Sequence, residues 1–129
     1  MFDPTIDYSR ADIQRLMGGE LQTYLPQRDN VILAGCFNRE LNPDAPAEIQ
    51  AGNLPRVARK AKLLSTQLNT VFPVFLKGRQ QDKKYRFVGY YRCRDYSTSK
   101  EVLATAEAKS GRSGELSYVL YLEEVPNRK

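Results

Sequence analysis

Hydrophobic residues recur along the chain with two periods, and together these predict three helices set among several strands. Apolar residues at i, i+3 and i+4 indicate helices, whereas apolar runs and strict alternation indicate strands. We expect helices over residues 9–17, 54–68 and 97–110, and strands over residues 21–26, 31–37, 47–52, 70–77, 85–96 and 116–125. This order predicts an α+β fold in which a mixed, curved sheet forms a partial barrel flanked by about three helices. We treat residues 1–129 as a single domain, because their number is near the usual domain size.

Polar residues at the start of each predicted segment set the expected helix boundaries. Ser9 can accept a hydrogen bond from the backbone of the first helix, and Asp12 occupies the third helical position, as in a capping box. Asn53 is the expected cap of the second helix. Either Ser97 or Thr98 is the expected cap of the third helix.

The strand expected over residues 85–96 alternates so regularly that it predicts two distinct faces. One face would carry Tyr85, Phe87, Gly89, Tyr91 and Cys93, and the other Arg86, Val88, Tyr90, Arg92 and Arg94. Pro73 lies inside the preceding strand, which predicts an edge position or a bulge there.

The composition excludes several kinds of site. The chain has no histidine, which removes Ser-His-Asp and Cys-His nucleophilic sites and histidine-containing zinc sites. Cys36 and Cys93 lie in apolar segments, and we expect buried free thiols rather than a disulfide. We therefore expect neither a metal nor a cofactor. The sequence has no apolar run long enough for a membrane span and no signal peptide at its start, which favours the cytoplasm.

Basic residues exceed acidic ones, and this surplus favours an anionic partner, nucleic acid before membrane. The formal net charge is +5, and seven basic residues but one acidic residue lie between Lys77 and Arg94, interleaved with aromatic rings. Cations neutralise phosphates and aromatic faces stack on bases. The expected phosphate-binding residues are Arg28, Arg56, Arg59, Lys60, Arg86, Arg92 and Arg94. The alternative is that these side chains form ordinary solvated faces beside core aromatic residues.

The loop after the strand "VILAGCF" raises a second functional possibility, because it is both polar and rich in proline. Asn42 and Asp44 can hydrogen bond the edge of an extruded base, while Phe37 or Tyr24 stacks on it. The alternative is an Asx-turn at Asn42 and Pro43 that only orders the loop.

A third possibility is a metal-dependent nuclease. Glu107 and Lys109 with Asp95 upstream resemble part of such a centre. However, side chains two residues apart on a helix point in different directions, so the expected helical setting disfavours this hypothesis.

Three segments carry a resemblance to a known domain type. "YLPQRDNVILAGCF", "NPDAPAEIQAG" and "VFPVFLKGRQQDKKYRFVGYYRCRDY" are similar, in order and strand pattern, to the PUA-like and SRA-like readers of modified bases found in modification-dependent restriction proteins. The resemblance spans roughly residues 19–125. It implies a curved sheet, phosphate contacts around a pocket for a flipped, modified base, and a separate nuclease as partner. The pocket residues would be Tyr24, Phe37, Asn42, Asp44 and Tyr90.

Two functions from different classes follow. The first is a non-enzymatic nucleic-acid-binding module, acting on DNA before RNA, that recognises modified bases. The second is a protein-interaction module, an inhibitor or adaptor, that binds an acidic partner surface.

Overall fold

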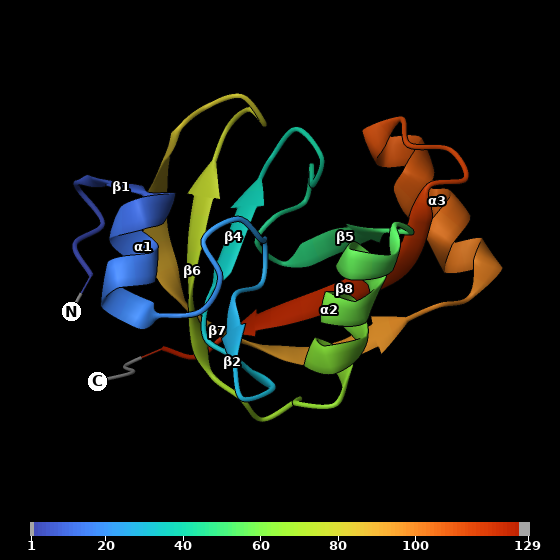
Figure 1. Ribbon diagram of the computed structural model, residues 1–129. Helices are drawn as coiled ribbons and strands as arrows, with labels where there is room; N and C mark the ends of the chain where they lie inside the picture. Colours follow the sequence, from blue (N-terminus) through green and yellow to red (C-terminus); the bar gives the residue numbers. More distant parts are fainter. Residues whose placement is uncertain (1, 127–129) are drawn as a thin grey trace.

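A computed structural model describes residues 2–126 and contains three helices, a six-stranded sheet and a short two-stranded sheet (Figure 1). The helices are α1 (Arg10–Met17), α2 (Pro55–Ser65) and α3 (Lys100–Ser110). The strands are β1 (Asp7–Ser9), β2 (Gln27–Arg28), β3 (Val31–Ile32), β4 (Gly35–Asn38), β5 (Glu48–Gly52), β6 (Phe72–Lys77), β7 (Lys84–Ser97) and β8 (Leu116–Glu124).

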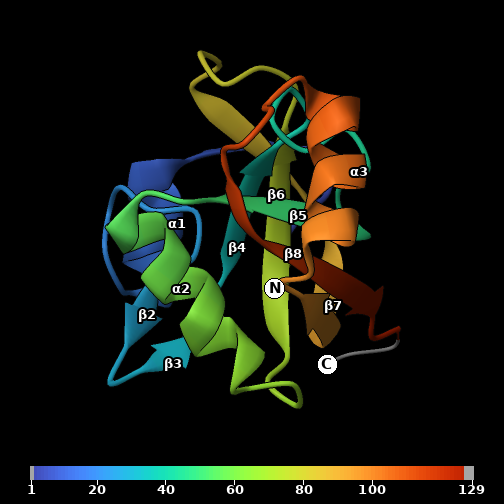
Figure 2. The same ribbon diagram turned by 90° about the vertical axis from the view of Figure 1, so that its right-hand side faces the viewer.

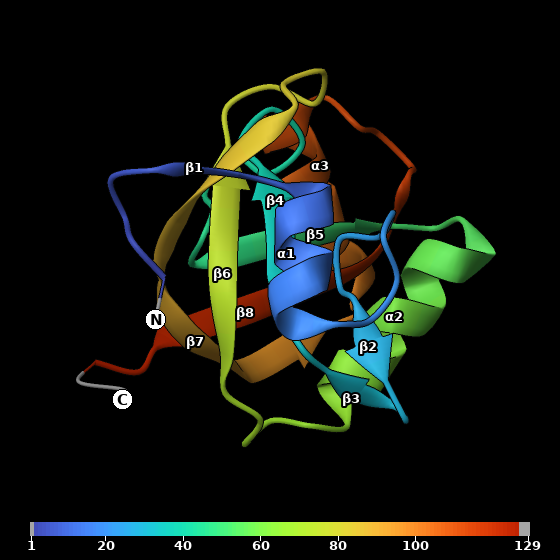
Figure 3. The same cartoon turned by 60° about the vertical axis from the view of Figure 1, so that its left-hand side comes forward.

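The large sheet is mixed and strongly curled, which confirms the predicted α+β fold with a partial barrel. Its strand order is β4-β6-β7-β8-β5, and β1 pairs with the first part of β7. The β4–β6 pair is parallel, whereas the other pairs in this sheet are antiparallel. Figure 3 shows the curl, with β8 crossing behind β6 in a very different direction. As the sequence predicts, β8 is central and β5 lies at one end of the sheet.

Each helix covers its own hydrophobic cluster. The main cluster joins Ala61 and Leu64 of α2 to sheet residues such as Leu120. The α1 cluster contains Ile13 and Phe75, and a third cluster contains Ala106 of α3 with residues of β8. Adjacent residues of one strand, such as Val74 and Phe75 of β6, belong to different clusters, so α1 and α2 pack on opposite faces of the sheet. Figure 2 shows α2 and α3 on different sides of the sheet.

The expected two faces of β7 are not continuous, because two bulges interrupt the strand. Tyr85 packs in the α1 cluster, whereas Tyr91 packs in the main cluster, although the alternation placed them on one face. The register with β6 shifts at Val88, beside Gly89. Gly89 has a φ of 138°, a conformation that other residues rarely adopt. The extra residue reverses the direction in which the following side chains point.

The proline in β6 lies just before this register shift. Pro73 pairs with Tyr90 of β7, and the shift follows between Val74 and Phe75. Pairing with β4 begins only at Val74. Pro73 therefore lies where one side of β6 has no ladder partner to lose, which matches the edge position, one of the two predicted alternatives.

The helix caps are partly as expected. Ser9 and Asp12 form a capping box at α1, as predicted. Asn53 does not cap α2, since Leu54 takes that position without a side-chain bond, and the Asn53 amide instead donates to the carbonyl of Gly114. The cap of α3 is Ser99, rather than the expected Ser97 or Thr98.

Residues 21–26 do not form the expected strand. The segment makes isolated hydrogen bonds to the chain around β4, in which the amide of Leu33 donates to Pro26 and that of Cys36 to Tyr24. A tight hairpin of β2 and β3 follows, with Asp29 and Asn30 at positive φ in its turn. The long strand expected over residues 31–37 is interrupted at Leu33 and Ala34, which separate β3 from β4.

Two further expectations concern the cysteines and membrane helices. Cys36 and Cys93 are buried free thiols, as predicted. No helix within residues 2–126 combines the length and the apolar character that a membrane span requires.

Candidate functional site

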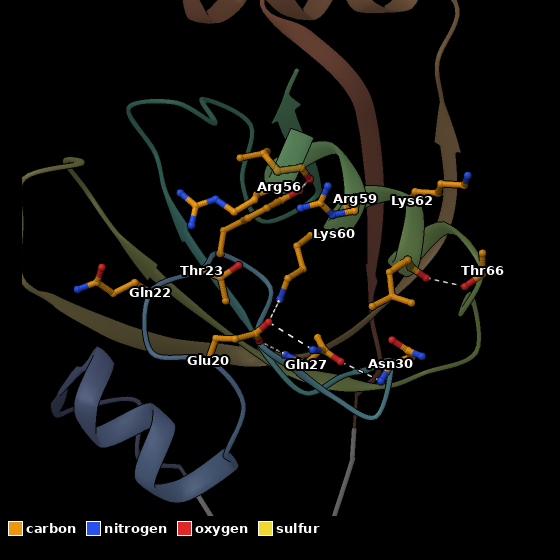
Figure 4. A pocket seen from close by; sticks show the side chains of 13 residues that line it. Glu20, Gln22, Thr23, Gln27, Asn30, Arg56, Arg59, Lys60, Lys62 and Thr66 are labelled. Atoms are coloured by element: carbon orange, nitrogen blue, oxygen red, sulfur yellow. Dashed lines mark hydrogen bonds and ion pairs between the residues drawn. The ribbon is translucent and has the colours of Figure 1, made fainter. Parts of the chain in front are cut away.

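A groove of about 770 Å³ lies between α2 and the segment of residues 20–30, and we call it the α2 groove (Figure 4). Its volume falls within the range of about 300–1,000 Å³ typical of ligand sites. The lining residues are Glu20, Gln22, Thr23, Tyr24, Gln27, Asn30, Arg56, Val57, Arg59, Lys60, Lys62, Leu63 and Thr66. These residues come from two parts of the chain that the fold brings together through the main hydrophobic cluster.

One wall of the α2 groove is cationic. Arg56, Arg59, Lys60 and Lys62 all come from α2, whose apolar residues Ala61 and Leu64 are buried against the sheet. Helical periodicity therefore leaves Arg56, Arg59 and Lys62 on the solvent side of the helix, whereas Lys60 is partly buried. Their charges exceed the single carboxylate in the lining, and the groove thus favours an anionic ligand.

The opposite wall is uncharged but rich in hydrogen-bonding groups. Gln22, Thr23, Gln27 and Asn30 supply amide or hydroxyl side chains to the lining. Such side chains can donate and accept at once, which suits the edge of a nucleobase. The pairing of a cationic wall with a polar, uncharged wall would allow phosphate binding and base contact in one groove.

Tyr24 joins these two walls. Its hydroxyl donates to the carbonyl of Val57 in α2 at 2.6 Å, and its ring packs edge-on against Phe37 at 6.4 Å. Burial raises the pKa of the Tyr24 phenol well above its ordinary value. The phenol therefore stays a hydrogen-bond donor and fixes the segment against the helix.

Lys60 and Glu20 form an ion pair across the groove. The Nζ of Lys60 lies 2.6 Å from a carboxylate oxygen of Glu20 and 2.9 Å from the carbonyl of Leu25. The backbone N–H of Gln27 donates to the same carboxylate at 2.8 Å. Burial alone would raise the pKa of Glu20, but these hydrogen bonds outweigh it and lower the pKa to about 2. Glu20 is therefore ionised throughout the physiological range.

The residues predicted to form a base pocket around residues 37–46 do not come together in the structure. Phe37 is only 2% exposed and belongs to the main cluster, so the prediction that it stacks on a base is wrong. Asn42 is 5% exposed, and its amide bonds the backbone of Gln50 and Asn38 inside the protein. The structural alternative, an ordered loop, is thus correct for Asn42, although its partners differ from those of an Asx-turn.

The other predicted pocket residues have separate surroundings. Asp44 is exposed, and its carboxylate pairs with Lys109 of α3 at 2.8 Å. Tyr90 packs its ring against Phe87, on the part of β7 that faces away from α2. Of the five predicted pocket residues, the α2 groove includes Tyr24 alone.

The seven predicted phosphate-binding residues are divided between surfaces. Arg56, Arg59 and Lys60 line the α2 groove. Four others lie outside its lining: Arg28 on β2, Arg86 paired with Asp7, Arg92 paired with Glu123, and Arg94 over the ring of Tyr121. The structure therefore does not gather the predicted cations into one patch, since Arg86, Arg92 and Arg94 are held beside their neighbours on the sheet.

The residues of the nuclease hypothesis likewise have separate partners. Lys109 binds Asp44 and Glu48, while Glu107 accepts the backbone N–H of Leu116. Asp95 accepts a bond from its neighbour in the chain. Within residues 2–126, no three acidic, cysteine or histidine side chains are grouped so that they could hold a metal ion.

Sequence reasoning missed the polar wall of the groove. The lining includes Gln22, Thr23, Gln27 and Asn30, from a segment whose first part the sequence predicts as a strand over residues 21–26. The polar run that follows the Gly18–Gly19 pair does indicate a loop. A segment that begins at two glycines and contains so many polar residues can bury little apolar surface. Its position opposite α2, however, depends on a contact between residues far apart in the sequence.

No family model matches the chain, and no curated protein or solved structure matches it either. The resemblance to readers of modified bases therefore stays a prediction.

Proposed function

We propose that this protein is a non-enzymatic nucleic-acid-binding module and that the α2 groove is its main contact with the nucleic acid. The observation that carries the proposal is the clustering of Arg56, Arg59, Lys60 and Lys62 along one wall. Basic residues spaced along a helix can neutralise successive phosphates of a backbone. The second, polar wall of the groove distinguishes this arrangement from an ordinary solvated basic helix.

The polar wall supports the finer part of the proposal, the reading of a base. Gln22 and Asn30 carry amide groups that match the donor and acceptor pattern of base edges. A base held there would lie opposite the arginines that hold its phosphates. In this proposal the groove, rather than the loop around Asn42, reads the base, with DNA preferred to RNA and modified bases preferred to plain ones. Cleavage would belong to a separate nuclease.

Paired charge-removing variants test the main contact. We expect Arg56→Gln/Arg59→Gln to weaken binding of a fluorescein-labelled 20-base-pair duplex by roughly tenfold or more in fluorescence anisotropy, because two phosphate contacts are lost. The matched control is Arg94→Gln/Lys100→Gln, which removes the same charge outside the groove. Equal losses in both variants would contradict the groove and return the predicted contact at Arg94 to consideration.

A panel of duplexes tests the reading of a base. Plain, cytosine-modified and adenine-modified duplexes of one sequence are compared by competition. A reader of modified bases prefers one modified duplex, and Asn30→Ala or Gln22→Ala reduces that preference by about 1–3 kcal/mol. An adaptor for an acidic protein surface would instead bind none of the duplexes.

A further inference from the structure

We propose that the carboxylate of Glu20 occupies a phosphate subsite of the α2 groove and that a nucleic-acid phosphate displaces it on binding. The inference rests on the proposed function, since it assigns a resident competitor to the same groove. It makes Glu20 an autoinhibitory group that lowers the affinity for any polyanion.

The donors around Glu20 form a built anion site. Lys60 approaches one carboxylate oxygen at 2.6 Å, the backbone N–H of Gln27 approaches the other at 2.8 Å, and the amide of Gln27 adds a third bond at 3.3 Å. An ammonium group with converging N–H donors is the arrangement that also binds phosphate oxygens. The subsite belongs to the groove, because Glu20, Gln27 and Lys60 all line it (Figure 4).

The subsite does not depend on Glu20 for its shape. Lys60 also donates to the carbonyl of Leu25 at 2.9 Å, and its side chain is only 17% exposed. Leu25 itself is fully buried in the main cluster. The ammonium group is therefore held in place by the core of the protein and would remain there after the carboxylate leaves.

Glu20 can leave through a local movement. Its side chain is 43% exposed, whereas its backbone carbonyl is held by the guanidinium of Arg10 at 2.9 Å. Rotation of the side chain toward solvent therefore breaks the three bonds without moving the segment. Gly19 lets this segment approach Gln27 closely, since a Cβ on Gly19 would lie 3.1 Å from the backbone nitrogen of Gln27.

Removal of the Glu20 charge is the direct test. We expect Glu20→Gln to bind the labelled 20-base-pair duplex about three- to tenfold more tightly than the wild-type chain, because no anion competes for Lys60. The matched control, Glu101→Gln, removes one negative charge from α3 outside the α2 groove and should change the affinity by less than about twofold. In the double variant Glu20→Gln/Lys60→Met the gain should disappear.

The outcomes separate this inference from the proposed function. If neither the wild-type chain nor Glu20→Gln binds the duplex, the proposed function fails. If the wild-type chain binds and Glu20→Gln binds equally or less tightly, or gains no more than Glu101→Gln, the displacement alone is overturned.

An NMR titration of the wild-type chain keeps the test valid even where Glu20→Gln folds poorly. Displacement predicts that the backbone amide resonance of Gln27 shifts when the duplex is added, because its acceptor changes from carboxylate to phosphate. A Gln27 resonance that stays unchanged while the duplex binds overturns the inference. A second titration uses inorganic phosphate alone. If millimolar phosphate shifts the Gln27 amide resonance, the subsite binds any phosphate; if only the duplex shifts it, the subsite needs the nucleic acid.

Discussion

The hydroxyl of Tyr24 lies 2.6 Å from the backbone carbonyl of Val57, so one side chain joins the segment before β2 to the first half of α2. The ring beneath this bond packs against Phe37 in the main cluster. The contact spans 33 residues of the chain and sets the distance between the two walls of the α2 groove.

Substitution of Tyr24 should separate the contributions of its ring and its hydroxyl. Tyr24→Phe removes one hydrogen bond and should lower the free energy of unfolding by about 1 kcal/mol, as measured by urea unfolding. Tyr24→Ala also removes the packed ring and should cost about 3–5 kcal/mol. Duplex binding should survive Tyr24→Phe, since the walls stay in place. Equal costs for the two substitutions would show that the ring contributes little.

The bulge in β7 gives a prediction about stability. Gly89 adopts a φ of 138°, and a Cβ there would lie 3.1 Å from the carboxylate of Glu124. Gly89→Ala should therefore lower the free energy of unfolding by about 1–3 kcal/mol. Gly78→Ala is the matched control, because its Cβ would meet its nearest atom at an ordinary 3.5 Å. A loss at Gly78 as large as that at Gly89 would contradict the role of the bulge.

The parts of the fold that local patterns determine could be predicted from the sequence. The capping box of Ser9 and Asp12, the buried face of α2 and the central position of β8 each follow from residues close together in the chain. The exceptions arise where pairing between strands overrides the local pattern. Alternation along β7 gave no sign of the shift at Val88, because a bulge depends on the partner strand.

The candidate site was harder to predict because its two walls are distant in sequence. The cations of α2 could be predicted individually, from charge and helical spacing. The polar residues that face them could not, since their placement depends on the bond between Tyr24 and Val57. The role of the loop around Asn42 was predicted wrongly for a related reason. A polar residue in a loop can contact a ligand or can hydrogen bond buried backbone groups, and the two roles look the same in the sequence. In the fold, Asn42 bonds the buried backbone of Gln50.

Asn42 and Asp44 should now differ in their effect on stability. Asn42 accepts the backbone N–H of Gln50 at 2.7 Å in a buried setting, so Asn42→Ala leaves that donor unpaired and should cost about 2–3 kcal/mol in urea unfolding. Asp44→Asn weakens an exposed ion pair with Lys109, and its unfolding midpoint should stay close to the wild-type value. Asp44→Asn should also leave the preference between plain and modified duplexes unchanged. A loss of that preference would restore the loop as the base-reading site.

The ion pair of Glu20 and Lys60 predicts how stability responds to acid. The folded chain holds the pKa of Glu20 at about 2, below its ordinary value of 4.5, because the hydrogen bonds to its carboxylate outweigh burial. The ionised carboxylate therefore stabilises the folded state above pH 4.5, and this contribution is lost as the pH falls from 4.5 toward 2. Glu20→Gln should unfold at lower urea than the wild-type chain at pH 7, and its stability should fall less between pH 5 and pH 2.5. A Glu20 carboxyl resonance that titrates near 4.5 in NMR would show that the folded chain does not favour the charged form.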